Sequence, residues 1–223
     1  ETWIVSEQCA NKIVFFEKEV KIIGDIAGSE IIGKSAIAPN SGNEIPILPA
    51  EFVEPGMGTG LVMSVPAHAP KDYQALMDLK AKNHELASKI EPIPIIVTEG
   101  YDEYPAKQIC EKLGVANQTD DKLEEATKEL YLKEFTDGKL NEKCAQFNNE
   151  KVQFGRDKVR EWLQENNHLE KFPVLENAPV HCRCGAECVV KILNNQWFLN
   201  YGDEEWKELA RNCFDEMNIL PSN

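Results

Sequence analysis

Residues 58–73 constrain this chain more than any other stretch of its sequence. They read GTGLVMSVPAHAPKDY and join a glycine-flanked threonine, an apolar run, a proline and an aspartate. Glycines on both sides of Thr59 let another group approach the backbone closely, because no Cβ atom stands in the way. The apolar run over residues 61–65 predicts a short strand that Pro66 ends. Asp72 opens the next helix, where its carboxylate can face the same cavity as the glycine bend, so the segment indicates a pocket for a small cationic ligand.

Composition and charge bound the function. The chain has 223 residues, enough for one core or for one core with an appendage. Its 24 basic and 38 acidic side chains give a formal net charge of −14, which is unfavourable for broad contact with nucleic-acid phosphates. No apolar run approaches the roughly 18 residues of a membrane span, and no secretory signal is visible. Seven scattered cysteines favour a reducing compartment, so we expect a cytoplasmic protein without a membrane partner.

Hydrophobic periodicity predicts an α+β fold. Apolar, often β-branched runs broken by glycines over residues 4–37 predict short strands in a barrel-like sheet. Residues 45–53 predict another strand, and residues 92–97 an extended segment. Peripheral helices are predicted over residues 73–88, 105–113 (with Gly114 as a C-cap), 120–134, 156–166 and 204–217.

The pattern of predicted elements changes near residue 177. Residues 180–193 predict a β-hairpin that turns near Gly185, and the last predicted helix follows it. We therefore divide the chain into a body, residues 1–177, and a returning ribbon and helix, residues 178–223.

The motif segment resembles the editing domain of leucyl-tRNA synthetases of the archaeal or eukaryotic cytosolic type. That family's pattern is a GTG turn, a strand ending in Val-Pro and an aspartate that opens the next helix, which correspond here to residues 58–60, Val65-Pro66 and Asp72. Further similarity to the family lies in residues 124–131, 140–144 and 196–202 (QWFLNYG), the last resembling the return toward the catalytic domain. The resemblance covers the chain from about residue 1 to residue 202.

The resemblance implies a barrel-like editing domain that hydrolyses noncognate aminoacyl-tRNA esters after transfer. Editing has a physical reason, because one methylene or a branch changes binding in an apolar pocket by only about 1–3 kcal/mol. The implied partners are the acceptor end of tRNA(Leu), a noncognate amino acid and the rest of a parent synthetase. The parent would charge tRNA(Leu) with leucine using ATP and Mg²⁺; this chain carries no ATP-binding signature, so no cofactor is expected in it.

Asp72 is the first candidate for catalysis. The resemblance implies that it anchors the free α-ammonium of the aminoacyl ester, an interaction of the charge-assisted kind. A helix-capping aspartate that favours the positive end of the helix dipole is the alternative. Thr59 is the second catalytic candidate, and with the substrate-binding candidates Gly58 and Gly60 it is expected to shape the floor under the terminal adenosine and the ester. A tight turn without a ligand is the alternative for this bend.

Three further residues are candidates for substrate binding. Met63 and Val65 lie on the predicted strand, and the resemblance places Met63 against the bound amino acid, where soft packing is suitable. Core packing is the alternative for both. His68 precedes Asp72 by four residues and could contact the ligand or act as a general base, whereas a merely solvated or hydrogen-bonded loop histidine is the commoner case.

The cysteines of residues 181–188 (HCRCGAEC) are the only cluster with the density of a metal site. Cys182, Cys184 and Cys188 are candidate zinc ligands, although their C-x-C-x₃-C spacing departs from the usual pairs. Buried, reduced cysteines are the alternative, and we assign no metal ligand from the sequence.

Two other functions stay open. The family's threonine-rich loop, of the form Thr-x-Arg-Pro-Glu-Thr, is not found in the chain, so we expect a piece that begins within the editing insertion. Such a piece could bind the end of tRNA without catalysis. The editing domain of an isoleucyl- or valyl-tRNA synthetase is the other alternative, because those enzymes carry similar GTG and aspartate elements.

Overall fold

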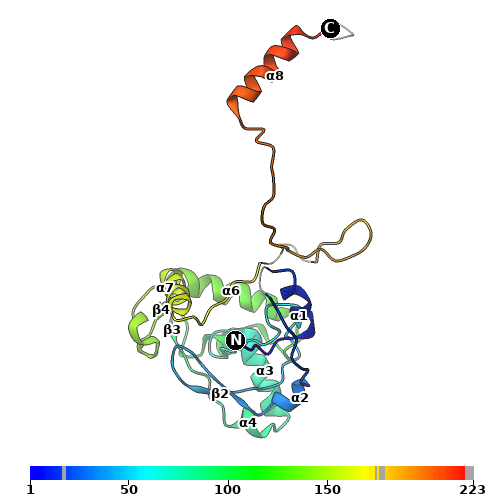
Figure 1. Cartoon of the computed structure of the whole chain (residues 1–223). Coiled ribbons are helices and arrows are strands. Elements are labelled where there is room, and N and C mark those ends of the chain that lie inside the picture. The colour runs from blue at the N-terminus through cyan, green and yellow to red at the C-terminus, as the bar shows by residue number, and fades with distance from the viewer. Residues whose placement is uncertain (17–18, 174, 176–178, 219–223) are drawn as a thin grey trace. The chain divides into compact units, whose positions relative to one another are not determined.

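The computed structural model describes residues 1–16, 19–173, 175 and 179–218, which form a mixture of helices and small sheets (Figure 1). The chain divides into two compact units, Glu1–Val190 and Lys191–Asn223. The first unit contains α1 (Glu7–Ile13), α2 (Gly28–Ile31), β1 (Ser35–Ile37), β2 (Glu44–Pro46), α3 (Pro70–Ala81), α4 (Glu85–Ser88), β3 (Ile96–Val97), α5 (Pro105–Leu113), α6 (Lys122–Asp137), β4 (Lys139–Leu140), a short 3-10 helix (Glu142–Phe147) and α7 (Val152–Glu165). The second unit contains α8 (Glu204–Glu216).

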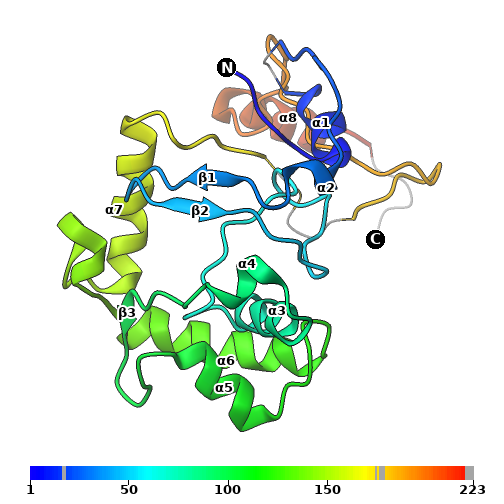
Figure 2. The same ribbon diagram turned by 90° about the horizontal axis from the view of Figure 1, so that it is seen from below.

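The main core lies where α3, α5 and α6 pack together (Figure 2). Its buried side chains come from one stripe of α5 and one stripe of α6: Ala106, Ile109, Cys110, Leu123, Ala126 and Leu130. Tyr73 of α3 packs against this cluster. Apolar residues three or four positions apart share a helix face, which is why these two helices bury one side each. The packing fixes α3, whose first turn carries Asp72.

The helices of this core follow their sequence signals. Pro105 starts α5 at a position where a missing N–H costs nothing, and Gly114 ends it with φ 63°, as predicted. The helix predicted over residues 73–88 is interrupted instead. Asn83 has φ 55° and ends α3, and the ring of His84 caps α4 by accepting a hydrogen bond from the Ala87 N–H. The prediction of helical structure was therefore right, but the structure has two helices, α3 and α4, where one was predicted.

The strands predicted near the N-terminus are largely wrong. Residues 4–37 form α1, α2 and only the short strand β1. The hydroxyl of Ser6 starts α1 by accepting a hydrogen bond from the Cys9 N–H at 3.0 Å, and this cap outweighs the β-branched character of the run. The strand predicted over residues 45–53 is shorter in the structure, where β2 ends at Pro46 and a pair of backbone hydrogen bonds joins Ile47 to Lys34 and Gly33.

No closed barrel is found among the described residues. They contain two separate antiparallel pairs, β1 with β2 and β3 with β4, and the first stands as its own hairpin in Figure 2. In the first pair Ala36 lies opposite Ile45, and in the second Ile96 lies opposite Leu140. The extended segment predicted over residues 92–97 is thus a strand only at its end. The mixed helix-and-sheet class is confirmed, and its barrel-like detail is not.

The C-terminal predictions are partly confirmed. A hairpin tip forms around Gly185, which has φ 86°, with a bridge between His181 and Glu187 in place of long strands. The carboxylate of Asp203 caps α8 by accepting a hydrogen bond from the Trp206 N–H at 2.9 Å, and α8 matches the predicted helix. The boundary predicted at residue 177 lies outside the described residues. None of the described helices has both the length and the apolar character to span a membrane.

Candidate functional site

Asp72 lies in the first turn of α3 and is 7% exposed. Its Oδ2 accepts a hydrogen bond from the backbone N–H of Val65 at 2.6 Å, and the Ser64 side chain also hydrogen-bonds to the carboxylate. The position suits a negative charge, because the first turn of a helix presents unpaired N–H groups and the positive end of the helix dipole. Asp72 therefore fastens the end of the motif segment to α3.

The charge of Asp72 is not balanced by a cation of the described residues. In the part of the chain that the structure describes, no lysine or arginine forms an ion pair with this carboxylate. Burial raises the pKa of Asp72 above 3.8, and the hydrogen bonds from Val65 and Ser64 oppose that shift without cancelling it. A bound cation stabilises a poorly hydrated carboxylate of this kind more than it stabilises an exposed carboxylate.

We expect Asp72→Asn to stabilise the folded chain at neutral pH. The asparagine side chain can still accept the Val65 hydrogen bond, and it removes a charge that burial disfavours. Because the folded-state pKa of Asp72 is raised above 3.8, its ionisation disfavours folding as the pH rises through that pKa. Thermal unfolding should therefore give a higher Tm for Asp72→Asn than for wild type at pH 7, and the difference should vanish as the pH falls below about 3.8. A lower Tm at pH 7 would contradict the unmatched charge.

The glycine bend packs against the start of α1. The Ser6 N–H donates to the Thr59 carbonyl at 2.8 Å, and a Cβ on Gly60 would lie 2.6 Å from the Ser6 Cβ. Gly60 is therefore required by packing, and its φ of 78° also suits glycine. Gly58 has φ 56°, and a Cβ on it would meet no atom within 4 Å, so there is free space next to its Cα atom. The Thr59 hydroxyl donates to the Leu61 carbonyl at 3.0 Å and closes the bend on itself.

A cavity of about 460 Å³ borders this bend. Its lining includes Met57 and Gly58 together with Lys12, Cys188 and Val189, and it does not include Asp72. Lys12 donates to the Gly56 carbonyl at 3.1 Å, which holds α1 against the bend. This cavity does not join the bend to Asp72, and a cleft shared by the two remains a prediction.

Residues 61–65, which follow the bend, form no strand, and a turn at residues 66–68 leads from them to α3. The prediction of a strand over residues 61–65 is therefore wrong, since the described residues offer these positions no ladder partner. Met63 is 58% exposed, so it is free to contact a ligand, whereas Val65 is half-buried. Their predicted contacts with a bound amino acid are compatible with this exposure and stay predictions.

His68 is buried and uses both ring nitrogens. Nε2 accepts hydrogen bonds from the N–H groups of Ile95 at 2.8 Å and Ile96 at 3.2 Å, and Nδ1 lies 2.6 Å from Oε1 of Glu134. Two backbone donors on Nε2 place the proton on Nδ1, which then donates to the Glu134 carboxylate. The ring thus ties the motif loop to β3 and to α6. Neither nitrogen is free in this arrangement, so substrate binding by His68 stays a prediction without a contact to support it.

Glu134 is a member of this network that no sequence motif indicated. It lies 66 residues from His68, on a helix whose charged positions look like an ordinary solvated face. Its side chain is nevertheless buried. The one available signal was its place on the apolar stripe of α6, four residues after Leu130.

The cysteine cluster lies at the hairpin tip around Gly185. Cys182 and Cys184 are exposed and Cys188 is partly buried. Hydrogen bonds from the Ala186 N–H and from the Cys182 side chain lower the pKa of Cys184. Within the described residues, no group of three or more His, Cys, Asp or Glu side chains is placed to hold a metal ion. Zinc binding by these cysteines stays an alternative that the sequence left open.

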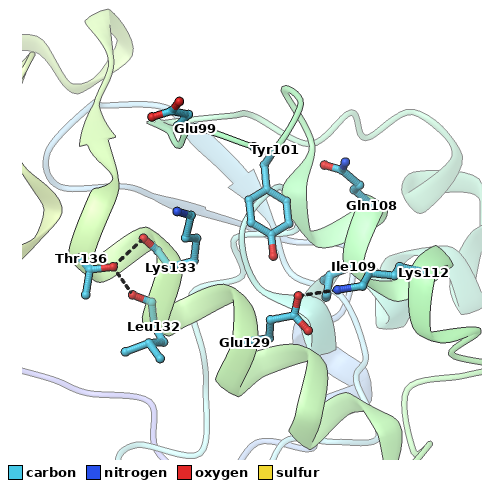
Figure 3. Close-up of a pocket in the computed structure, with 10 residues that line it drawn as sticks. Glu99, Tyr101, Gln108, Ile109, Lys112, Glu129, Leu132, Lys133 and Thr136 are labelled. Atoms are coloured by element: carbon cyan, nitrogen blue, oxygen red, sulfur yellow. Dashed lines mark hydrogen bonds and ion pairs between the residues drawn. The ribbon is translucent and has the colours of Figure 1, made fainter.

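A second cavity, of about 610 Å³, lies between α5, α6 and the loop at residues 99–101 (Figure 3). No motif in the sequence indicated it. Two of its lining residues form ion pairs: Lys112 lies 2.6 Å from Glu129, and Lys133 pairs with Asp137 at 2.5 Å. Neither Asp72 nor a residue of the glycine bend lines this cavity.

Solved structures with this arrangement are editing domains of aminoacyl-tRNA synthetases. The crystal structure of GlLeuRS-CP1 is 28% identical, with a TM-score of 0.66 over 77% of this chain and 70% of that chain. The editing domain of the P. knowlesi cytosolic leucyl-tRNA synthetase is 19% identical, with a TM-score of 0.62 over 74% of this chain and 62% of that chain, and it supports the fold alone. The fold is therefore one that this chain shares with solved parts of leucyl-tRNA synthetases.

Sequence comparisons identify the family. The family model described as "Leucyl-tRNA synthetase, editing domain" matches residues 25–89, which include the motif segment. Leucine–tRNA ligases of Methanococcus maripaludis and Methanocaldococcus jannaschii are 46% and 45% identical over 222 residues, or 99% of this chain. The chain belongs to the leucyl-tRNA synthetase family and corresponds to its editing domain. It spans 23% of the length of these two relatives.

Proposed function

We propose that the chain hydrolyses noncognate aminoacyl esters on tRNA(Leu), as the proofreading part of a leucine–tRNA ligase. The observation that carries this proposal is the buried carboxylate of Asp72, which no cation of the described residues neutralises. An aminoacyl ester supplies the missing cation, because its α-amino group is free and positively charged. A charge-assisted hydrogen bond to Asp72 would then fix the ester next to residues 58–65.

The reaction needs little chemistry from the protein beyond positioning. Water attacks the ester carbonyl, the new carbon–oxygen bond replaces the bond to the ribose oxygen, and that oxygen takes a proton. The products are the free amino acid and uncharged tRNA. Holding the ester and a water molecule at reacting distance raises their effective molarity, which is a large share of the rate enhancement in such reactions. Thr59, Gly58 and Gly60 would support the terminal adenosine, with Met63 and Val65 beside the amino acid.

The acidity of the chain limits how it meets RNA. With a net charge of −14, we infer that the domain contacts only the acceptor end, while other parts of the polypeptide hold the body of the tRNA. The parent polypeptide would work in the cytoplasm and would use ATP and Mg²⁺ for the charging reaction outside this chain. The relatives' name, leucine–tRNA ligase, supports the charging reaction of the parent.

The proposal is tested by deacylation. The 223-residue chain is incubated with tRNA(Leu) charged separately with isoleucine, valine, methionine or leucine, and release of the amino acid is followed. We expect at least one noncognate ester to be hydrolysed about tenfold or more faster than the leucyl ester, the order of discrimination that a second sieve adds. Binding of tRNA ends without hydrolysis of any ester would instead support a non-catalytic binding module.

A further inference from the structure

One face of α6 lies against the loop that leads into the Asp72 helix. Glu134 anchors this face, because its carboxylate accepts a hydrogen bond from the Nδ1–H of His68 at 2.6 Å. Tyr131 precedes Glu134 by three residues, and side chains three apart on a helix are neighbours on one face. Asp72 lies four residues after His68, in the first turn of α3, and α3 packs directly against α6. The contact between His68 and Glu134 therefore brings Tyr131 to the side of Asp72.

The electrostatics of Tyr131 agree with this placement. Its phenol pKa is raised above 10.0, first by burial and then by the negative charges of Asp72 and Glu134. The hydroxyl consequently stays protonated at neutral pH. The side chain is also 49% exposed, unlike Tyr73, which packs into the core. Tyr131 thus presents an accessible, neutral aromatic ring next to an unmatched carboxylate.

An aromatic ring beside a carboxylate is a suitable combination for an ammonium group. The face of a tyrosine ring carries partial negative charge and attracts a cation that lies within about 6 Å of its centre. The carboxylate supplies a directional hydrogen bond, and the ring covers the cation from another side without competing for its protons. Glu134 cannot take this place, because its carboxylate is buried and already bonded to His68.

We propose that Tyr131 is a further substrate-binding residue, which contacts the α-ammonium of the aminoacyl ester together with Asp72. This inference rests on the proposed function, since it takes the aminoacyl ester as the ligand. It assigns part of the ammonium site to α6, outside the motif of residues 58–73. His68 and Glu134 then act as positioning residues that hold the ring in place.

Two stable analogues test the proposal by titration calorimetry with the full chain. The first is valine joined through an amide to 3′-amino-3′-deoxyadenosine, with its α-amino group free. The second is the same compound with that group acetylated, so that it carries no positive charge. We expect wild type to prefer the free amine, and we expect Tyr131→Ala to reduce this preference about three- to tenfold through loss of the cation–π contact. Tyr131→Phe keeps the ring and should retain most of the preference.

Leu132→Ala is the matched control, because Leu132 is the adjacent residue of α6 and is 67% exposed. It should bind both analogues as wild type does, and thermal unfolding of all variants shows whether they fold. A full preference for the free amine in Tyr131→Ala, together with its loss in Asp72→Asn, would overturn the role of Tyr131 and leave the proposed function intact. Absence of any preference in wild type would overturn both.

Discussion

Asp72→Ala is expected to slow hydrolysis of misacylated tRNA(Leu) at least about 100-fold, the scale on which misplacement of a reacting group reduces rates. The substitution removes the carboxylate proposed to hold the α-ammonium, and it also removes the acceptor for the Val65 N–H. The ester would then bind in many orientations, few of which present the carbonyl to water. Release of the amino acid under single-turnover conditions measures the effect directly.

Asp121→Ala is a suitable control for that experiment. Asp121 is an exposed carboxylate that precedes α6, and its side chain makes no capping hydrogen bond. Both variants lose one negative charge, so a general effect of net charge on the attraction of tRNA would appear in both. Only Asp72→Ala should lose hydrolysis. Activity within about threefold of wild type in Asp72→Ala, a change of less than about 1 kcal/mol, would show that the carboxylate does not anchor the substrate.

Leu130→Ala is expected to lower the free energy of unfolding by about 2–5 kcal/mol. Leu130 is 0% exposed and lies in the cluster that joins α5 to α6. Its loss would leave a cavity in the packing that holds α6 in place, and with it the face that carries Glu134. Urea unfolding followed by circular dichroism gives the value, provided that the slope with denaturant is unchanged.

Leu132→Ala makes the same chemical change two residues further along the same helix. Because Leu132 is 67% exposed, its truncation should alter the free energy of unfolding by no more than about 0.5 kcal/mol. Equal effects of the two substitutions would mean that α6 is not fastened through its Leu130 face.

Local signals in the sequence were sufficient to predict several helices. Pro105 and Gly114 mark the two ends of α5, and the apolar stripe of α6 is visible as Leu123, Ala126 and Leu130. The N-terminal elements were not predictable in this way. Near α1, the Ser6 cap favours a helix and the β-branched run favours a strand. Packing of the glycine bend against Ser6 determines which of the two structures forms. Such a contact between distant residues has no local signature.

The candidate site was predictable only in part, because local patterns are visible in the sequence and contacts between distant residues are not. Asp72 was identified because a carboxylate in the first helical turn after a glycine bend is a local pattern, and its burial agrees with a binding role. The surroundings of Asp72 were not visible. Glu134 and Tyr131 come from a helix far along the chain, and the use of both His68 nitrogens follows from contacts with β3 and α6. Sequence alone therefore suggested a loop histidine where the structure has a buried hydrogen-bonded link.

The most direct measurement compares two substrates that differ by one charge. Misacylated tRNA(Leu) is prepared with its α-amino group either free or acetylated, and hydrolysis of each is followed with wild type and with Asp72→Ala. If the carboxylate of Asp72 binds the α-ammonium of the ester, wild type hydrolyses the free-amine substrate about tenfold or more faster than the acetylated one. Asp72→Ala then shows no such preference. Equal rates on the two substrates with wild type would contradict the account.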